Sequence, residues 1–497
     1  METVKRTVSI LMALALVIAL GGLIWADQRY PAPAASAGQA AAVEVAPGDS
    51  LAVCPGALAL PGEGEDEVVY DPRFDPNPTS VEAITRTVVE GGNGGRANLL
   101  EGDQPTILAE PLSVATTTVE TTPFQVEAYS SDTAPAIATG GVYQHIADGD
   151  LRGVAAASCV PPAIESWIVA GSTEPGSSAR LILVNPGYTT VTADLTLWDG
   201  AGLVEAVGLT GLVVPAGSQR VVLLEGFVGD AARLAVRVTA AGGELAAFLQ
   251  HSRLQGLVQG GVEIAVPSAA PATTVMVPGL NLTESSFDSP RVSTLRVLNP
   301  GTAPAQIAVQ LWGPDGKTTL PGLEDAQVNP GLVTDLSLGG LPAGYYAAVI
   351  SSDQPVVAAG FSLRAEEDSS PEEFAWSAAP VPAEHGFVVL PASDLSATLT
   401  AGSGVDSTLT VTPVNPSGEL GEPTTFELKA GTIEAWDLET LGAAAEDAAL
   451  EFQWEAEPGL LALVVSADQA DGELISVLAP EGRWATATTV KVYPALP

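Results

Sequence analysis

Two cysteines carry the most clearly defined chemistry in this chain of 497 residues. Cys54 and Cys159 are expected to form one disulfide, because an even cysteine count outside the cytoplasm is typical of paired thiols. The bridge would close a loop of roughly 100 residues and contribute up to about 4–5 kcal/mol by the chain-entropy argument. A Cys-His nucleophile is the catalytic alternative, and it requires a free thiol. A lipid on Cys54 conflicts with Val53, which stands where lipidation needs a small residue.

Two tryptophans are the candidates for contact with a glycan or a protein partner. Trp198 and Trp312 end the alternating segments V-T-A-D-L-T-L-W (191–198) and I-A-V-Q-L-W (307–312). Successive side chains of a strand point to opposite faces, so the pattern predicts both rings on the wetter face, beside a turn. A ring there could stack on a sugar. The structural alternative is a lid over a neighbouring loop, or the joint between repeat units.

Histidines and acidic runs do not form a recognisable catalytic or metal-binding pattern. His145 and His251 recur at equivalent repeat positions, which favours a structural role, and His385 is the third histidine. The motifs H-E-x-x-H, G-x-S-x-G, S-x-x-K and the P-loop are missing from the sequence. The acidic runs at 65–67 and 366–368 lack the alternating ligands and Gly of a calcium loop. We therefore expect no catalytic residue, no metal and no cofactor.

An internal repeat of 114 residues positions these side chains. R-L-I-L-V-N-P-G (180–187) and L-R-V-L-N-P-G (295–301) each run on to a Leu-Trp pair, and a weaker copy, T-V-T-P-V-N-P, ends at Pro416. A period this long is the size of a domain, so the chain is an array of similar modules. Each module has about seven short apolar strands between turn signals, which is typical of an immunoglobulin-like antiparallel sandwich.

The Asn-Pro-Gly step of the repeat predicts a tight turn. Asn185 and Asn299 can each start a turn through the side chain, the following Pro fixes φ near −65°, and Gly accepts a positive φ after it.

An uncharged apolar run at 8–26 follows Lys5 and Arg6. A helix of this length spans roughly 28 Å, about the thickness of a hydrocarbon core, and the two basic residues place the N-terminus in the cytoplasm. We expect an uncleaved, single-pass membrane anchor with the bulk of the chain extracytoplasmic. The alternative is a signal peptide cleaved near Ala35-Ser36-Ala37 and a secreted protein.

The formal net charge of −40 restricts the kinds of partner that the protein is expected to bind. Such a field repels nucleic acid and anionic lipid head groups, so neither is an expected ligand. Solubility in a crowded envelope is the plain explanation of the charge, and recruitment of cations or a basic partner is the alternative.

The predicted organisation is all-β: tandem immunoglobulin-like antiparallel β-sandwich modules after one N-terminal transmembrane helix, arranged as a stalk. The predicted segments are a cytoplasmic tip and anchor (1–26), a linker (27–42), a divergent N-terminal β module with an insertion (43–162), and three sandwich repeats (163–270, 271–384 and 385–497).

Several short motifs together resemble a known family. They are Cys159-Val160-Pro161, S-W-I-V-A-G-S-T (166–173), L-V-N-P-G and L-Q-H-S-R-L-Q-G-L (249–257). With the N-terminal run, they are similar to uncharacterised actinobacterial envelope proteins catalogued as a domain of unknown function. The resemblance implies an anchored extracytoplasmic protein and supplies no functional residues.

The leading functional expectation is a non-catalytic scaffold or interaction protein of the cell envelope. A protein that binds envelope glycans is the second expectation. A hydrolase without a recognisable motif is the third, because paired carboxylates remain open among 59 acidic residues.

Overall fold

The computed structural model describes residues 12, 41–60, 83–100, 105–131, 135–289, 291–365, 371–391, 394–455, 457–470, 472–480 and 488–492. These residues form antiparallel β-sheets, so the predicted all-β class is confirmed. Within these ranges no helix is both long enough and apolar enough to cross a membrane. The predicted anchor (1–26) and linker (27–42) lie almost wholly outside the described residues.

Two compact units make up the chain, one of residues 1–46 with 487–497 and the other of residues 47–486. In the first unit, β1 (Ala41–Val45) pairs antiparallel with β34 (Thr488–Val492), so segments from the two ends of the sequence form one small sheet. Every site described below belongs to the second unit.

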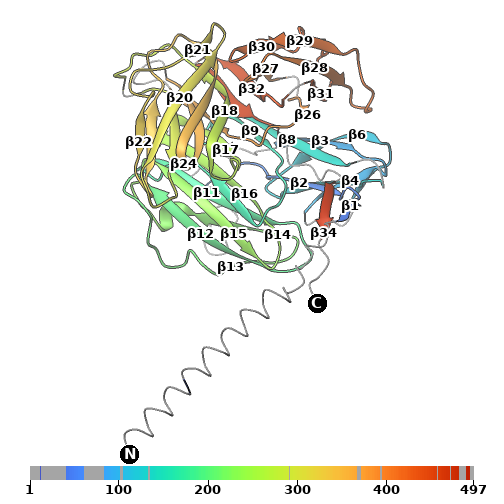
Figure 1. Cartoon of the computed structure of the whole chain (residues 1–497), viewed down its shortest axis with the longest axis horizontal. Coiled ribbons are helices and arrows are strands. Elements are labelled where there is room, and N and C mark those ends of the chain that lie inside the picture. Colours follow the sequence, from blue (N-terminus) through green and yellow to red (C-terminus); the bar gives the residue numbers. More distant parts are fainter. Residues whose placement is uncertain are drawn as a thin grey trace, which may run out of the picture. The chain divides into compact units, whose positions relative to one another are not determined.

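The strands of the second unit fall into four successive groups, which Figure 1 colours in turn from blue to red. In the first group, β2 to β9 form two sheets with the orders β2-β7-β4-β5 and β6-β3-β8-β9. Their bounds are Ser50–Cys54, Ala83–Glu90, Gly95–Leu99, Thr106–Leu108, Leu112–Val119, Phe124–Ala128, Ile137–Ile146 and Gly153–Ser158.

The second group repeats this plan with the orders β10-β15-β12-β13 and β14-β11-β16-β17. The bounds of β10 to β17 are Glu165–Ile168, Ser177–Asn185, Val191–Asp199, Leu212–Val214, Ser218–Leu223, Leu234–Ala241, Ala246–Gln255 and Val258–Ala265. One 3-10 turn, η2 (Leu224–Gly226), follows β14.

The third group joins its strands through one long strand, β24 (Gly344–Arg364). The first part of β24 pairs with β18 and β20, and its last part pairs with β19 and β25. The other bounds are β18 (Ala272–Leu282), β19 (Thr294–Leu298), β20 (Ala305–Gly313), β21 (Gly316–Thr318), β22 (Ala326–Val328), β23 (Val333–Ser337) and β25 (Glu373–Ala378).

The fourth group returns to two separate sheets, β26-β31-β28-β29 and β30-β27-β32-β33. The bounds of β26 to β33 are His385–Val389, Ser396–Gly402, Ser407–Val414, Thr424–Leu428, Ile433–Asp437, Ala449–Trp454, Leu460–Gln469 and Gly472–Leu478. The predicted module boundaries stay a prediction.

The first group shares the strand order of its neighbours although its sequence diverges. Cys54 ends β2 in one sheet, Cys159 follows β9 in the other, and the two form a disulfide. The predicted disulfide is therefore confirmed. Both cysteines are buried in the core of this group, so the bridge ties its two sheets together from inside. The insertion was predicted between Cys54 and Cys159, and part of that segment, residues 61–82, lies outside the described residues.

The four groups close on one another in a ring. The last strands of the groups, β9, β17, β25 and β33, contact each other in turn, and β33 contacts β9. Ser158 Oγ donates to Ala479 O at 2.7 Å, which links the first group directly to the fourth. The predicted stalk is thus wrong. In a stalk, the last strand of each group would have been exposed to solvent. In the structure, these four strands are almost wholly buried and cover one another.

Two fully buried carboxyl groups lie where these four strands meet. Glu263 accepts hydrogen bonds from Ser476 Oγ at 2.6 Å and from the Ile264 amide at 2.9 Å. Glu373 accepts one from the Phe374 amide at 3.0 Å. Burial raises the pKa of both carboxyl groups well above the ordinary value for glutamate.

The Asn-Pro-Gly turns form as predicted in one respect and differ in another. Asn185 Oδ1 accepts from the Gly187 amide and Asn299 Oδ1 from the Gly301 amide, each at 3.0 Å, so the Asn side chain does start the turn. Neither glycine has a positive φ. A Cβ on Gly187 would stand 3.2 Å from Asn185 Oδ1, so close approach to that oxygen favours Gly here.

Candidate functional site

A cleft of about 560 Å³ lies between the second and third strand groups. Alternate residues of neighbouring strands line it: His251, Arg253 and Gln255 from β16, and Phe361 and Leu363 from β24. Because side chains of a strand alternate between its faces, each strand contributes one row to the cleft. Thr294 and Arg296 of β19, Trp376 of β25 and Glu372 just before β25 line it as well.

An arginine–glutamate–arginine cluster crosses the cleft. Arg291 Nε lies 2.8 Å from Glu372 Oε1, and Arg253 Nη1 lies 3.5 Å from Glu372 Oε2. The glutamate side chain is only 3% exposed, whereas the two arginine side chains are 26% and 27% exposed. The cluster therefore has a buried anion and two guanidinium groups that reach solvent.

A second arginine pair stabilises the wall of the cleft. Arg296 makes a bidentate contact with Asp335, at 2.8 Å and 3.0 Å, across β19 and β23. The same guanidinium group donates to the carbonyl oxygens of Gly171 and Ala232, both in the second strand group. It also stacks 4.8 Å from the ring of Trp376. Arg296 thus holds the two groups together with its donors engaged.

His251 is buried beside these charges in a defined tautomer. The Trp376 indole N–H donates to His251 Nδ1 at 3.1 Å. An indole nitrogen can only donate, so Nδ1 must be unprotonated and the proton of the neutral ring is on Nε2. Burial, assisted by the charges of Arg253 and Arg296, lowers the pKa of His251 well below its ordinary value. The ring therefore stays neutral at physiological pH, with its proton on the buried Nε2.

The chemistry that this arrangement supports is binding. Guanidinium groups and an imidazole N–H are donors for the oxygen atoms of a ligand. His251 Nδ1 is already engaged by Trp376, so this nitrogen is not free to act as a general base. Phe361 and Leu363 add apolar surface to the same cleft.

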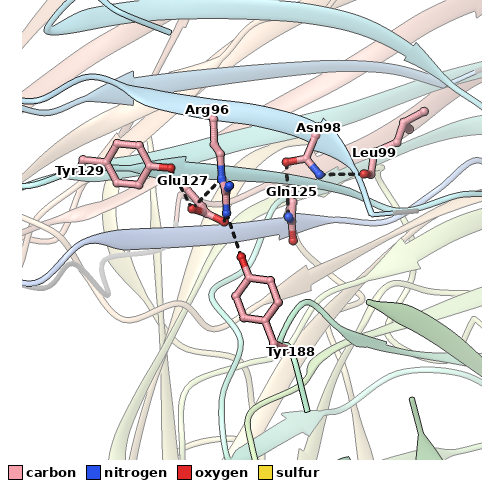
Figure 2. A network of polar contacts seen from close by, with 7 residues as sticks. All are labelled: Arg96, Asn98, Leu99, Gln125, Glu127, Tyr129 and Tyr188. Carbon is pink, nitrogen blue, oxygen red and sulfur yellow. Dashed lines mark hydrogen bonds and ion pairs between the residues drawn. The ribbon is translucent and has the colours of Figure 1, made fainter. Parts of the chain in front are cut away.

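A separate polar network joins the first and second strand groups, as Figure 2 shows. Arg96 of β4 makes a bidentate contact with Glu127 of β7 and donates to Tyr188 Oη at 3.1 Å. These hydrogen bonds to Glu127 and Tyr188 raise the pKa of Arg96 above its ordinary value. Tyr188 follows Asn185-Pro186-Gly187, and its side chain is otherwise exposed. The network braces a loop of one group against a sheet of the other.

Glu90, His385 and Glu451 form a cluster with residue types that can bind a metal. His385 Nε2 lies 2.9 Å from Glu451 Oε1, whereas Nδ1 lies 4.0 Å from Glu90 Oε2. The two carboxylates face different ring nitrogens, so the imidazole bridges them instead of sharing one ion with them. The hydrogen bond with Glu451 raises the pKa of His385, which favours the charged ring. The cluster is best explained as an ion-pair bridge between the first and fourth groups.

Trp198 does not lie on a wet face, so that prediction is wrong. The residue is 6% exposed, and its ring stacks on Trp167 with centroids 5.5 Å apart. The Arg237 guanidinium group lies 6.0 Å from the centre of the Trp198 ring. The residue is on the outer face of its sheet as the alternation predicts, but side chains from β10 and β15 cover it.

Trp312 is buried for a different reason. It is 4% exposed and packs against Ile433 and Leu460 of the fourth strand group. Its indole N–H donates to Gln310 Oε1 at 3.2 Å. Trp312 therefore packs at a contact between the third and fourth strand groups. Neither tryptophan presents an open ring to a glycan or a partner.

The remaining candidates from the sequence lie at joints or outside the described residues. His145 Nε2 is 2.9 Å from Gln469 Nε2, and Nδ1 is 3.5 Å from Asp394, so His145 joins the first group to the fourth. The acidic runs at 65–67 and 366–368 fall outside the described residues.

Sequence reasoning missed the residues of the cleft. Arg253 belongs to one repeat unit, and Arg291 and Glu372 lie far apart in the sequence of the next unit, so no local motif contains the three together. One signal for the cleft was present in L-Q-H-S-R (249–253), because His251 and Arg253 are two residues apart in a strand and so point to the same face. Their partners could not be chosen from the sequence, because the contact depends on how two groups pack.

Comparisons with known proteins give a family and no activity. The sequence matches the description "Family of unknown function (DUF5719)" over residues 113–439. No curated protein matches the chain. A matching solved structure is the Streptomyces avermitilis alpha-L-rhamnosidase complexed with L-rhamnose, at 10% identity and a TM-score of 0.13. The match covers 81% of this chain and 55% of that one, so the chain spans about half of its length. A score this low carries no argument about fold or activity.

Proposed function

The chain belongs to the DUF5719 family of unknown function, and we propose that it is a non-catalytic interaction protein that works outside the cytoplasm. The observation that carries the proposal is the cleft with its arginine–glutamate–arginine cluster, set between two strand groups of a closed ring. A rigid ring holds such a cluster in a fixed geometry, which suits recognition of a ligand or partner.

The disulfide supports an extracytoplasmic location, because structural disulfides persist mainly in oxidising compartments. The apolar run at 8–26 with Lys5 and Arg6 before it supports a single-pass anchor in the cell membrane with a cytoplasmic N-terminus. Secretion after signal cleavage is the alternative. Membrane fractionation followed by N-terminal sequencing separates the two, since only an anchor keeps residues 1–26 on the membrane-bound protein.

We extend the proposal to the architecture and the source. The sheet pairs are immunoglobulin-like modules, which their repeated strand orders support. An experimental structure in which the groups do not pack as sandwiches would overturn this. A composition rich in Ala, Val and Gly with few Lys residues fits a high-GC, actinobacterial genome.

In-cell cross-linking with mass spectrometry tests the proposed function. The wild type should recover specific envelope components, and an Arg253→Gln/Arg291→Gln variant should recover fewer of them. Arg220→Gln is the matched control, because it removes an exposed guanidinium group of β14 outside the cleft. Recovery of no envelope component by the wild type would refute the proposal.

Glycan binding is the second candidate function, and one observation favours it. The cleft combines charged side chains, neutral polar side chains and apolar surface from Phe361 and Leu363. Sites for polar small molecules have this mixture. A pull-down on cell-wall polysaccharide should retain the wild type and release the Arg253→Gln/Arg291→Gln variant. Equal retention of both proteins would exclude the cleft as the glycan site.

A further inference from the structure

A hollow of about 410 Å³ lies between the first and second strand groups, beside the network of Figure 2. It is lined by Arg96, Asn98 and Gln125 of the first group, and by Tyr188 and two glycine-containing turns of the second. Asn98 of β4 lies opposite Gln125 of β7, and both project from the face that points away from the core of their group. The volume is within the usual range for small-molecule sites.

Tyr188 presents an aromatic ring to solvent in a fixed orientation. The residue is 86% exposed, yet its Oη accepts a hydrogen bond from Arg96 Nη2 at 3.1 Å. Figure 2 shows the ring reaching Arg96 through this hydroxyl group. The contact at the tip holds the ring while its exposure leaves the ring open to a ligand. A side chain that is already held loses less conformational freedom on binding.

The turn that carries Tyr188 does not require an aromatic residue. The equivalent position of the next repeat, 114 residues on, is Thr302. Both turns nevertheless make the same hydrogen bond, from the Gly187 amide to Asn185 Oδ1 and from the Gly301 amide to Asn299 Oδ1. The exposed ring is therefore an addition to the repeat and not a part of its fold.

Gln125 has a buried acceptor without a donor. The residue is 8% exposed, and Oε1 has no hydrogen-bond partner in the part of the chain that the structure describes. The orientation of its amide is set, because Asn98 Nδ2 donates to Leu99 O and leaves Asn98 Oδ1 to accept from Gln125 Nε2 at 3.3 Å. Figure 2 shows the Gln125 oxygen directed away from Asn98. A buried carbonyl oxygen without a partner is unfavourable, so a ligand that donates to it would be favoured.

The charges around the hollow select a neutral ligand. Arg96 is the one charged residue among the described residues of its lining. Its guanidinium group makes two hydrogen bonds with Glu127, at 2.9 Å and 2.7 Å, so the two charges balance within the protein. A neutral ligand with O–H donors for Gln125 and an apolar face for Tyr188 matches this lining, and a sugar ring has both.

The position of the hollow in the sheet argues against an extended peptide. Peptides that add a strand need a free sheet edge. β4 and β7 each have a paired strand on both sides, in the order β2-β7-β4-β5. The hollow therefore lies over a sheet face, where a ligand contacts side chains.

We infer that the hollow binds a neutral glycan, with one sugar ring against Tyr188 and a sugar hydroxyl group donating to Gln125 Oε1. The inference goes beyond the proposed function, because this hollow shares no lining residue with the cleft that holds the arginine–glutamate–arginine cluster.

Fluorine NMR of the full-length protein labelled with 3-fluorotyrosine tests the inference. The chain has eight tyrosines, and Tyr188→Phe identifies the Tyr188 signal by its loss. The probes are cellohexaose, mannohexaose and chitohexaose, in a detergent without a sugar head group. At least one of them should shift the Tyr188 signal until the shift saturates. No shift with any of the three, or a shift with a decaproline peptide alone, would overturn the inference.

Variants separate stacking on the ring from bracing by its hydroxyl group. Tyr188→Thr introduces the residue of the next repeat and should weaken binding of the active hexasaccharide about tenfold in a calorimetric titration. Tyr188→Phe should keep most of the affinity, because it keeps the ring. Phe287→Ala is the matched control, since it removes an exposed ring outside the hollow. Circular dichroism confirms that each variant is folded. Unchanged affinity in folded Tyr188→Thr, or equal losses in Tyr188→Thr and Tyr188→Phe, would contradict the inference.

Two further variants connect the binding to its site. Gln125→Leu should also weaken it, because the acceptor for the sugar hydroxyl group is lost. The Arg253→Gln/Arg291→Gln variant should leave the Tyr188 shift unchanged, and loss of the shift in this folded variant would contradict a separate site. Failure of the in-cell cross-linking with a shift here would refute the envelope role and leave this site standing. Success there with no shift here would do the reverse.

Discussion

The Cys54–Cys159 disulfide should dominate the stability of the first strand group. The bridge spans 105 residues. The chain-entropy relation, in which the entropy change is −2.1 − 1.5R ln n, then gives about 4.8 kcal/mol at 25 °C. Residual structure in the unfolded chain makes this an upper limit. A Cys54→Ala/Cys159→Ala variant should therefore lose most of this free energy in the first group.

Hydrogen exchange read by mass spectrometry measures this loss where it occurs. Since about 1.4 kcal/mol is a factor of ten, the protection of amides in β2 and β9 should fall by as much as a thousandfold or more. Amides of β20, in the third group, should change much less, because the core of that strand contains no residue of the first group. Tryptophan fluorescence is a poor substitute, since residues 43–162 contain no tryptophan.

Single variants separate the cross-link from the packing of the sulfur atoms. Cys54→Ala and Cys159→Ala each abolish the bridge but each removes only one sulfur. If the cross-link is the cause, both single variants and the double variant should lose nearly equal protection. A fall of less than tenfold in β2 and β9 of the double variant would refute the reasoning.

Three further outcomes are expected. Trp312→Ala should lower the free energy of unfolding by about 3–5 kcal/mol, because it empties the contact with Ile433 and Leu460; a loss under 1 kcal/mol in a urea titration would contradict this. Asn185→Asp should lower the free energy of unfolding by about 1–3 kcal/mol, because Nδ2 donates to Thr189 O, Val214 O and Pro215 O. The same change at the more exposed Asn415 should lower it less in the same assay. Glu263→Gln should stabilise the protein at neutral pH. The raised folded-state pKa of Glu263 makes the wild type most stable below the unfolded-state pKa and less stable as pH rises through the folded-state pKa, and glutamine has no such pH dependence. An unchanged pH dependence of the melting temperature would count against this explanation.

Local chemistry could be predicted because it depends on neighbours in the sequence. The Asn185 turn follows from a short side chain that reaches an amide two residues on. The strands follow from apolar alternation between turn signals, and the disulfide from an even cysteine count. The pattern predicts the wrong reason for the glycine in the turn. Glycine is favoured because a Cβ would come too close to the Asn oxygen, and not because φ is positive.

The tryptophans show where this reasoning fails. Alternation places Trp198 and Trp312 correctly on the outer faces of their strands. Exposure then depends on what packs on those faces, namely Trp167 in one case and Ile433 with Leu460 in the other. Those residues lie tens to more than a hundred positions away, so no local pattern reveals them.

The sequence by itself determined the strands, the turns, the repeat and the cysteine pair, because each rests on short-range preferences or on counting. Only the tertiary structure decided that the four strand groups close into a ring and that Arg253, Arg291 and Glu372 meet in one cleft. The physical reason is that both depend on how whole sheet edges pack, because buried strands such as β9 and β33 pack against each other instead of facing water. A sequence records which strand edges are apolar, but not which edge each one will meet.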